Sequence, residues 1–307
     1  MYYMIKENKI FMSNEYNKQE GNFQDACIGI FGYEEIEMIS EKFGIDKTIF
    51  NDVSESKTAR YESLDGFDFI CVNVMDYANL YVSQRRVMIY LRKKFALFFC
   101  QQPSRVKTIF DECSSNKPEN ITFNRMIYNF FNKLTTADSG IFDSIEKEIM
   151  DLEKALITSK KRDCVKEIIS LRKRLMILKK YYEQFLDVLD DVSENENRIF
   201  DKKTLRYFKV LENRIDRLYH NVLNLRDYVT QVREAYQAEV DISLNTTMKV
   251  FTVVTTIFLP LTLIVGWYGM NLEMPEYSWK YGYEMVIILS AVIILGCVVY
   301  FKKNNWF

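Results

Sequence analysis

Apolar residues recur at helical spacing along the middle of the chain. Between Ile141 and Leu259 there is no glycine or proline, the two strongest breakers of regular structure. Within this stretch two runs of apolar residues repeat with alternating steps of three and four, which is the spacing of a helix seam. The first seam comprises Ile168, Leu171, Leu175, Leu178, Tyr182, Phe185 and Leu189, and the second comprises Leu211, Ile215, Leu218, Val222, Leu225, Val229, Val232 and Tyr236. The pattern predicts long helices.

Turn residues cluster near 158–159 and at 193–197, so we expect these helices to be separated there. A seam can be buried within its own chain or against another subunit. The spacing of the second seam favours another subunit. Because no proline separates this seam from the apolar run after it, one helix is predicted from about 202 to 267.

Residues 1–135 show a different pattern. Short segments rich in β-branched and aromatic residues alternate with glycine, asparagine, aspartate or charged clusters, which is typical of strands and turns. The predicted strands cover 27–33, 67–75, 87–91 and 95–100, and helices are expected over 34–44 and 121–135. The fold class is therefore α+β, with a small mixed sheet followed by long helices.

Two uncharged apolar runs lie near the C-terminal end. Val250–Trp267 and Met285–Phe301 are each long enough, or nearly so, to cross a hydrocarbon layer about 30 Å thick. Tryptophan and tyrosine at their ends are suited to the membrane interface. We predict two transmembrane helices; the alternative is a pair of buried core helices.

Basic residues near these runs predict their orientation. Lys249 precedes the first run, and Lys302 and Lys303 begin the tail 302–307, whereas the connecting loop 268–284 carries only Lys280. The positive-inside rule places both termini in the cytoplasm and this loop outside. We therefore expect a multi-pass protein of the plasma (inner) membrane with a large cytosolic part.

Composition excludes several classes of function. Lys+Arg 41 against Asp+Glu 42 gives a net charge of -1, which argues against nucleic-acid binding. A single histidine, His220, argues against histidine-dependent catalysis and multi-histidine metal sites. The six cysteines form no C-x-x-C pair and are interpreted as reduced thiols. We expect neither an enzyme nor a resident cofactor.

One face of the first apolar run suggests what it does. Two spans cannot enclose a path for water, so a pore would need several chains around an axis. The stripe has no acidic side chain in the membrane and mixes oxygen-bearing with apolar residues: Asn245, Met248, Phe251, Thr255, Leu259 and Thr262. Neutral oxygens suit Mg²⁺, which sheds water reluctantly, and Met248 and Phe251 can gate by dewetting. Alternatively, the threonines bond to their own helix and the stripe serves helix packing.

The first run ends in Tyr268-Gly269-Met270-Asn271, and a second run follows soon after. A Gly-Met-Asn at this place, followed by a lysine-rich tail with an aromatic tip, resembles the CorA family of magnesium transport proteins. The resemblance implies an α/β domain over 1–135, two antiparallel helices over 136–200 and a stalk helix over 201–249. It also implies a funnel-shaped homopentamer whose first span, 250–267, lines the pore.

The resemblance further implies passive entry of Mg²⁺, with Co²⁺ and Ni²⁺ as secondary substrates. Gly269, Met270 and Asn271 match the selectivity motif, in which Gly269 permits a sharp turn and Asn271 amides bind the water shell of Mg²⁺. Asn245 and Met248 match an inner polar ring and the gate above it. Phe251 stands where the family usually has an aliphatic residue, so the gate is expected to be bulkier.

Regulation by cytosolic Mg²⁺, which closes the pore, is also implied. We expect Asp52 and Glu234 to bind this ion across a subunit interface, because close carboxylates repel until a cation bridges them. Two other hypotheses remain. A Zn²⁺ or Ni²⁺ transporter of the same superfamily is disfavoured by Met270, and a two-span membrane-anchored coiled coil for signalling or tethering would pass no ions.

Overall fold

The computed structural model describes residues 1–6, 9–13, 26–50, 59–75, 85–115, 122–136, 138–157, 164–271, 279–304 and 306. It divides into two compact units, Met1–Val232 and Arg233–Phe307. Helix α7, Lys202–Tyr268, contributes residues to both.

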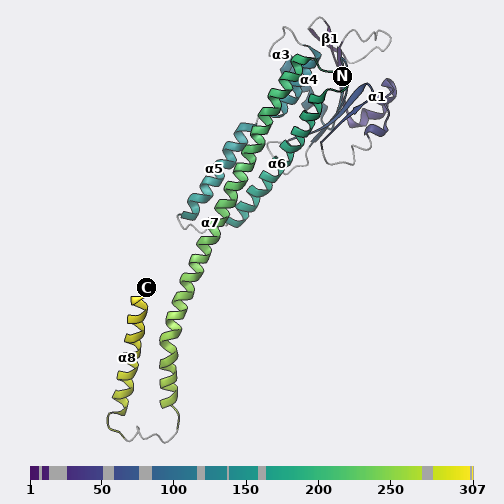
Figure 1. The fold of residues 1–307 in the computed structure, drawn as a ribbon. Coiled ribbons are helices and arrows are strands. Elements are labelled where there is room, and N and C mark those ends of the chain that lie inside the picture. Colours follow the sequence, from purple (N-terminus) through teal and green to yellow (C-terminus); the bar gives the residue numbers. More distant parts are fainter. Residues whose placement is uncertain are drawn as a thin grey trace. The chain divides into compact units, whose positions relative to one another are not determined.

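A seven-stranded mixed sheet lies in the first unit (Figure 1). Its order is β2-β1-β3-β7-β6-β5-β4; β3 and β7 are parallel, and the other neighbours are antiparallel. The strands are β1 (Tyr2–Lys6), β2 (Lys9–Ser13), β3 (Ala26–Gly32), β4 (Arg60–Leu64), β5 (Phe67–Val74), β6 (Arg85–Arg92) and β7 (Phe95–Cys100). The predicted mixed sheet and its four predicted strands are confirmed, and β1, β2 and β4 extend it at both edges.

Alternating residues of the central strand β7 bury both faces of the sheet. On one face Phe95 and Phe99 join a core cluster with Ile39 of α1 (Ile36–Phe43), which follows the 3₁₀ turn Tyr33–Glu35. On the other face, the ring of Phe98 lies 5.1 Å from Phe110 of α3 (Pro103–Ser115) and 5.0 Å from Phe130 of α4 (Phe123–Leu134). The sheet is thus a middle layer between helices.

Three long helices follow: α5 (Asp138–Ile157), α6 (Cys164–Glu194) and α7. Every residue of the first seam is buried. In the second seam Leu211, Ile215, Val222, Val229 and Val232 are at most 3% exposed within this single chain. Leu218 and Leu225 are half-buried. The expectation that a partner subunit fills this seam is therefore wrong at the five buried positions, because the chain's own side chains cover them.

The carboxyl end of α4 is fastened to α6 and α7. Arg214 of α7 donates from Nη1 to Asn132 Oδ1 (2.9 Å) and from Nη2 to the Asn132 carbonyl (3.2 Å) and the Thr135 hydroxyl. Tyr181 of α6 donates its hydroxyl to the Leu134 carbonyl at 3.4 Å. These donors satisfy acceptors that the last turn of a helix leaves open, so α4 links the sheet to α7.

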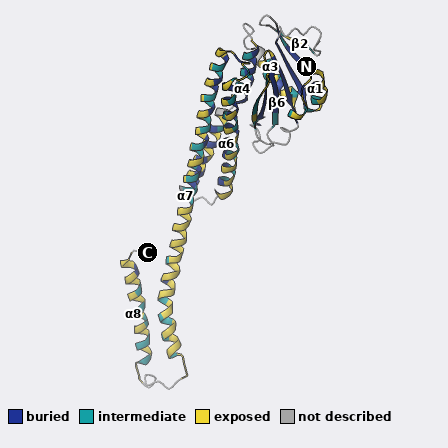
Figure 2. Ribbon diagram, turned by 45° about the vertical axis from the view of Figure 1, so that its right-hand side comes forward, coloured by how far each residue is buried: buried dark blue, intermediate teal, exposed yellow. Residues whose placement is uncertain are grey.

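The second unit contains the remainder of α7 and helix α8 (Gly282–Lys303). Both helices contain an apolar window long enough to cross a membrane, and only 6% of each window is buried (Figure 2). The alternative of two buried core helices is therefore wrong. The predicted spans Val250–Trp267 and Met285–Phe301 fall within α7 and α8, and α7 continues through Pro260.

Candidate functional site

The six predicted pore-lining residues form one exposed face of α7. Because each residue turns an α-helix by about 100°, their spacing confines them to roughly a third of its circumference. The side chains of Met248, Phe251 and Leu259 are 62%, 61% and 70% exposed within the chain. Asn245, Thr255 and Thr262 are exposed as well. The face is thus available to a partner, to lipid or to water.

The threonine hydroxyls on this helix donate to backbone carbonyls of the preceding turn. Thr255 Oγ1 lies 2.9 Å from the Phe251 carbonyl, and Thr262 Oγ1 lies 2.8 Å from the Phe258 carbonyl. This bonding is the one foreseen by the helix-packing alternative. Each of these hydroxyls donates its proton to the backbone and keeps free lone pairs on its oxygen. The two exposed side chains can therefore act as hydrogen-bond acceptors. Water bound to a metal cation directs its protons outward and needs such acceptors.

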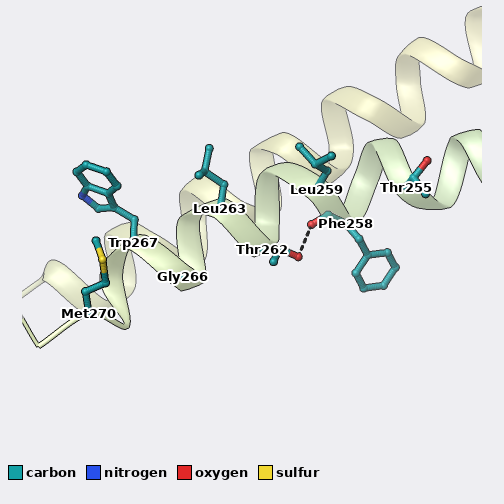
Figure 3. Close-up of a pocket in the computed structure, with 8 residues that line it drawn as sticks. All are labelled: Thr255, Phe258, Leu259, Thr262, Leu263, Gly266, Trp267 and Met270. Carbon is teal, nitrogen blue, oxygen red and sulfur yellow. Dashed lines mark hydrogen bonds between the residues drawn. The ribbon is translucent and has the colours of Figure 1, made fainter.

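An apolar hollow of about 780 Å³ runs along the same face (Figure 3). The described residues that line it are Thr255, Phe258, Leu259, Thr262, Leu263, Gly266, Trp267 and Met270. Three of the predicted pore-lining residues and Met270 of the motif are among them. The prediction missed Phe258, Leu263, Gly266 and Trp267. Continuing the stripe from Thr262 by a step of four would have found Gly266, and a neighbouring row with steps of four from Leu259 contains Leu263 and Trp267.

Helix α7 ends at the Gly-Met-Asn motif. The Gly269 amide donates to the Val265 carbonyl at 2.9 Å, and the Met270 amide donates to the Trp267 carbonyl at 3.4 Å. A Cβ on Gly269 would lie 2.8 Å from the Val265 oxygen, while the backbone of Gly269 is outside the left-handed region. This close approach favours glycine at position 269, and the sharp turn expected there stays a prediction because residues 272–278 lie outside the described residues.

Asn271 follows directly and is exposed. Its amide is unburied at the end of the helix, where it can be presented to a ligand. Glu284 lies in the first turn of α8, while Glu273 and Glu276 lie outside the described residues. An acidic residue near this end of the unit would raise the local concentration of cations.

The described residues include only one member of the predicted regulatory pair. Asp52 lies outside the described residues, and Glu234 is an exposed residue of α7 in the second unit. Among the residues that the structure describes, no group of three metal-ligating side chains is found. The pairing of Asp52 with Glu234 stays a prediction.

Negative charge is concentrated at the end of α6. Asp187, Asp190, Asp191 and Glu194 lie there, and the pKa of Asp191 is raised by partial burial and then by the charges of Glu194, Asp190 and Asp187. The repulsion among these carboxylates would be relieved by protonation or by a nearby cation.

Comparison with known proteins places this arrangement in a family. The family model described as CorA-like Mg²⁺ transporter protein matches residues 33–303. The cobalt/magnesium transport protein CorA of Thermotoga maritima is 28% identical over 91% of this chain and 81% of its own length. The protein of the same name from Methanocaldococcus jannaschii is 27% identical over 89% of this chain and 88% of its own.

Solved structures share the fold. The complete structure of the CorA magnesium transporter from Methanocaldococcus jannaschii has a TM-score of 0.80 and 22% identity, covering 100% of this chain and 99% of that one. The full-length CmaX protein has a TM-score of 0.77 at 15% identity, covering 99% and 97%. These structures confirm the α+β fold with long helices. Because the family model spans most of the chain and includes both apolar helices, the chain belongs to the CorA family of divalent-cation transporters.

Proposed function

We propose that this chain is a subunit of a passive channel through which Mg²⁺ enters the cell down its electrochemical gradient. This proposal rests on the exposed Asn271 amide, which follows an exposed face of α7 that carries no acidic side chain between Asn245 and Met270. The family assignment and the names of the relatives, which refer to magnesium and cobalt transport, support this substrate class.

Selection of the ion rests on its water coat. Mg²⁺ holds its water in a small, rigid octahedron, and stripping it is costly. A ring of Asn271 amide oxygens would accept hydrogen bonds from that water and so select hydrated size and charge. Along α7, Thr255 and Thr262 continue the supply of acceptors, since their protons are already donated within the helix.

Assembly is needed because one chain offers only a single wall of the path. The number five comes from the family resemblance, and a homopentamer would turn the face of α7 in each subunit toward a shared axis. Met248 and Phe251 would then form apolar rings that close the path by dewetting. Phe251 makes this constriction bulky.

The driving force requires no cofactor. A membrane potential of 100 mV, negative inside, favours entry of a divalent ion by about 4.6 kcal/mol. Both termini lie on the cytoplasmic side of the inner membrane, in keeping with the lysines that flank the spans. Mg²⁺ bound between cytosolic regions through Asp52 and Glu234 would close the channel when the internal concentration is high.

The test is ion uptake by proteoliposomes that contain a Mg²⁺-sensitive dye. Asn271→Ala should abolish saturable uptake driven by an imposed potential. The matched control is Asn304→Ala, which removes an exposed amide at the end of α8, outside the proposed path. Undiminished uptake in Asn271→Ala would remove the selectivity assignment.

Ion uptake by the same vesicles also distinguishes the channel from the two other hypotheses, a Zn²⁺ or Ni²⁺ transporter and a membrane-anchored coiled coil. Uptake of Zn²⁺ or Ni²⁺ that needs a proton gradient, with no Mg²⁺ entry, would favour the other transporters of the superfamily. The complete absence of ion flux from well-folded protein would favour the anchored coiled coil. Protection of the chain from limited proteolysis by millimolar Mg²⁺, weakened in the double variant Asp52→Ala/Glu234→Ala, tests the sensor.

A further inference from the structure

A basic pocket of about 580 Å³ lies in the first unit, apart from the residues assigned to ion conduction. The turn between β4 and β5, the turn between β6 and β7, the first turn of α4 and the loop before α7 meet there. The described residues that line it are Gly66, Arg92, Lys93, Lys94, Asn124 and Ile199. Its volume is in the range of pockets that hold small molecules.

Three consecutive cations dominate this pocket. Arg92, Lys93 and Lys94 are all exposed, and no described lining residue is acidic. The guanidinium of Arg92 lies 5.8 Å from the ring centre of Phe67 and 5.7 Å from that of Tyr90, which orients its head group. Like charges gathered in a concave site raise the local concentration of anions.

The opposite wall adds to the positive potential. Asn124 is the second residue of α4, and the amino end of a helix carries partial positive charge. The nearby carboxylate of Asp201 is already engaged, because it accepts a hydrogen bond from the Thr204 amide at 2.8 Å and another from Asn124. A hydrogen bond from the Thr204 side chain, followed by those from the Thr204 amide and Asn124, lowers the pKa of Asp201, so this carboxylate stays ionised at the start of α7. Asp65, Glu196 and Asp201 are exposed acids on the segments around the pocket, but the charged residues that line it are the bases Arg92, Lys93 and Lys94.

The walls are fixed before any ligand arrives. Asn197, in the loop before α7, donates to the Leu64 carbonyl at 2.8 Å and to Asp68 Oδ1 at 2.7 Å. It also accepts from the Gly66 amide at 3.2 Å. This one side chain holds the loop against the β4–β5 turn, and a preorganised pocket loses less free energy on binding.

The backbone conformation of the turn between β6 and β7 does not require a lysine at position 94. Lys94 has φ 61°, in the left-handed region that glycine occupies at least cost. Its carbonyl accepts the Cys27 amide at 2.8 Å, a bond that any residue type would make. Strain at a residue whose side chain lines a pocket points to a use for that side chain.

From this juxtaposition we propose that the pocket binds a soluble, phosphate-bearing anion with two or more negative charges. Arg92, Lys93 and Lys94 pair with phosphate oxygens, the amino end of α4 adds its partial charge, and Ile199 gives an apolar wall for the remainder of the ligand. Binding of this anion needs no ion flux, so this proposal is tested independently of the proposed channel function.

The test is calorimetric titration of pyrophosphate into the full-length protein in phosphatidylcholine nanodiscs. We expect saturable binding, and the double variant Arg92→Ala/Lys93→Ala should raise the dissociation constant at least tenfold, since two charge-assisted contacts are lost. The matched control is Arg172→Ala/Lys173→Ala, which removes the same two charges from the exposed face of α6 and should bind as the parent does.

A second variant separates binding from folding. Lys94→Gly relieves the left-handed strain, so it should raise the thermal midpoint while weakening pyrophosphate binding about tenfold. Equal binding by the parent and both pocket variants, or no saturable binding, would overturn the proposal. Loss of pyrophosphate binding when the nanodiscs contain phosphatidylglycerol would assign the cations to lipid head groups and would also overturn it.

Discussion

Helix α7 repeats apolar side chains at helical spacing in both units, but the two parts of the helix bury them differently. In the first unit Leu211 and Ile215 are at most 1% exposed, whereas in the second Leu259 and Leu263 are 70% and 66% exposed (Figure 2). The first part is covered by its own chain. The apolar face in the second unit is not covered by its own chain. Such a face is unfavourable in water and marks a surface that contacts lipid or other subunits.

The largest expected effect compares one truncation in each part. Ile215→Ala should lower the free energy of unfolding by about 2–5 kcal/mol, because it opens a cavity in a filled core. Leu259→Ala should change it by less than about 0.5 kcal/mol, because no side chain of the same chain covers that position. Denaturant unfolding in detergent, followed by circular dichroism, measures both. Equal losses would break the distinction between the two parts.

A smaller effect tests how the first unit holds α7. Arg214→Ala removes the donors to Asn132 and Thr135 at the end of α4 and should cost about 1–3 kcal/mol, since those acceptors lose their partners. Arg214→Lys should recover part of the loss because it keeps one charged donor. The same unfolding measurement applies. A loss under about 0.5 kcal/mol in Arg214→Ala would show that packing alone fixes the helix.

The smallest effect concerns the acidic end of α6. The pKa of Asp191 is raised in the folded chain, so its charged form disfavours folding at neutral pH, and this cost vanishes once the pH is below the unfolded pKa. Asp191→Asn should therefore stabilise the protein at pH 7, by about 0.5 kcal/mol or less because the side chain is half-buried and screened. The thermal midpoint should show a gain that shrinks as the pH falls. A gain that grows toward acid would contradict this sign.

Much of the fold could be predicted from periodicity. The long helices, the two apolar spans and the central strands each bury or expose a regular set of side chains, which leaves a strong pattern. The edge strands β2 and β4 were missed because none of their residues of described burial is buried, so they leave only a weak alternating pattern. Helix α3 was missed although Pro103 at its first position is a common helix start.

The candidate site was predicted less completely. The stripe on α7 followed from spacing, and the Gly-Met-Asn motif from resemblance. The physical reason for Gly269 could not be read from the sequence, since it depends on the distance to the Val265 carbonyl. The second seam was assigned to a partner because spacing alone does not say which chain fills it.

The central claim is that the exposed face of α7 borders the ion path, and cysteine accessibility in proteoliposomes tests it most directly. A parent in which Cys113, Cys164 and Cys297 are replaced by alanine is suitable, because burial raises the pKa of the three remaining thiols, Cys27, Cys71 and Cys100, to about 12, 11 and 12 and keeps them unreactive.

In that parent, Thr255→Cys lies on the exposed face, and Val253→Cys replaces a side chain that is 5% exposed, on the other side of the helix. A charged, water-soluble thiol reagent should block Mg²⁺ uptake through Thr255→Cys and leave Val253→Cys and the parent unaffected. Block of Val253→Cys with no effect on Thr255→Cys would contradict the account.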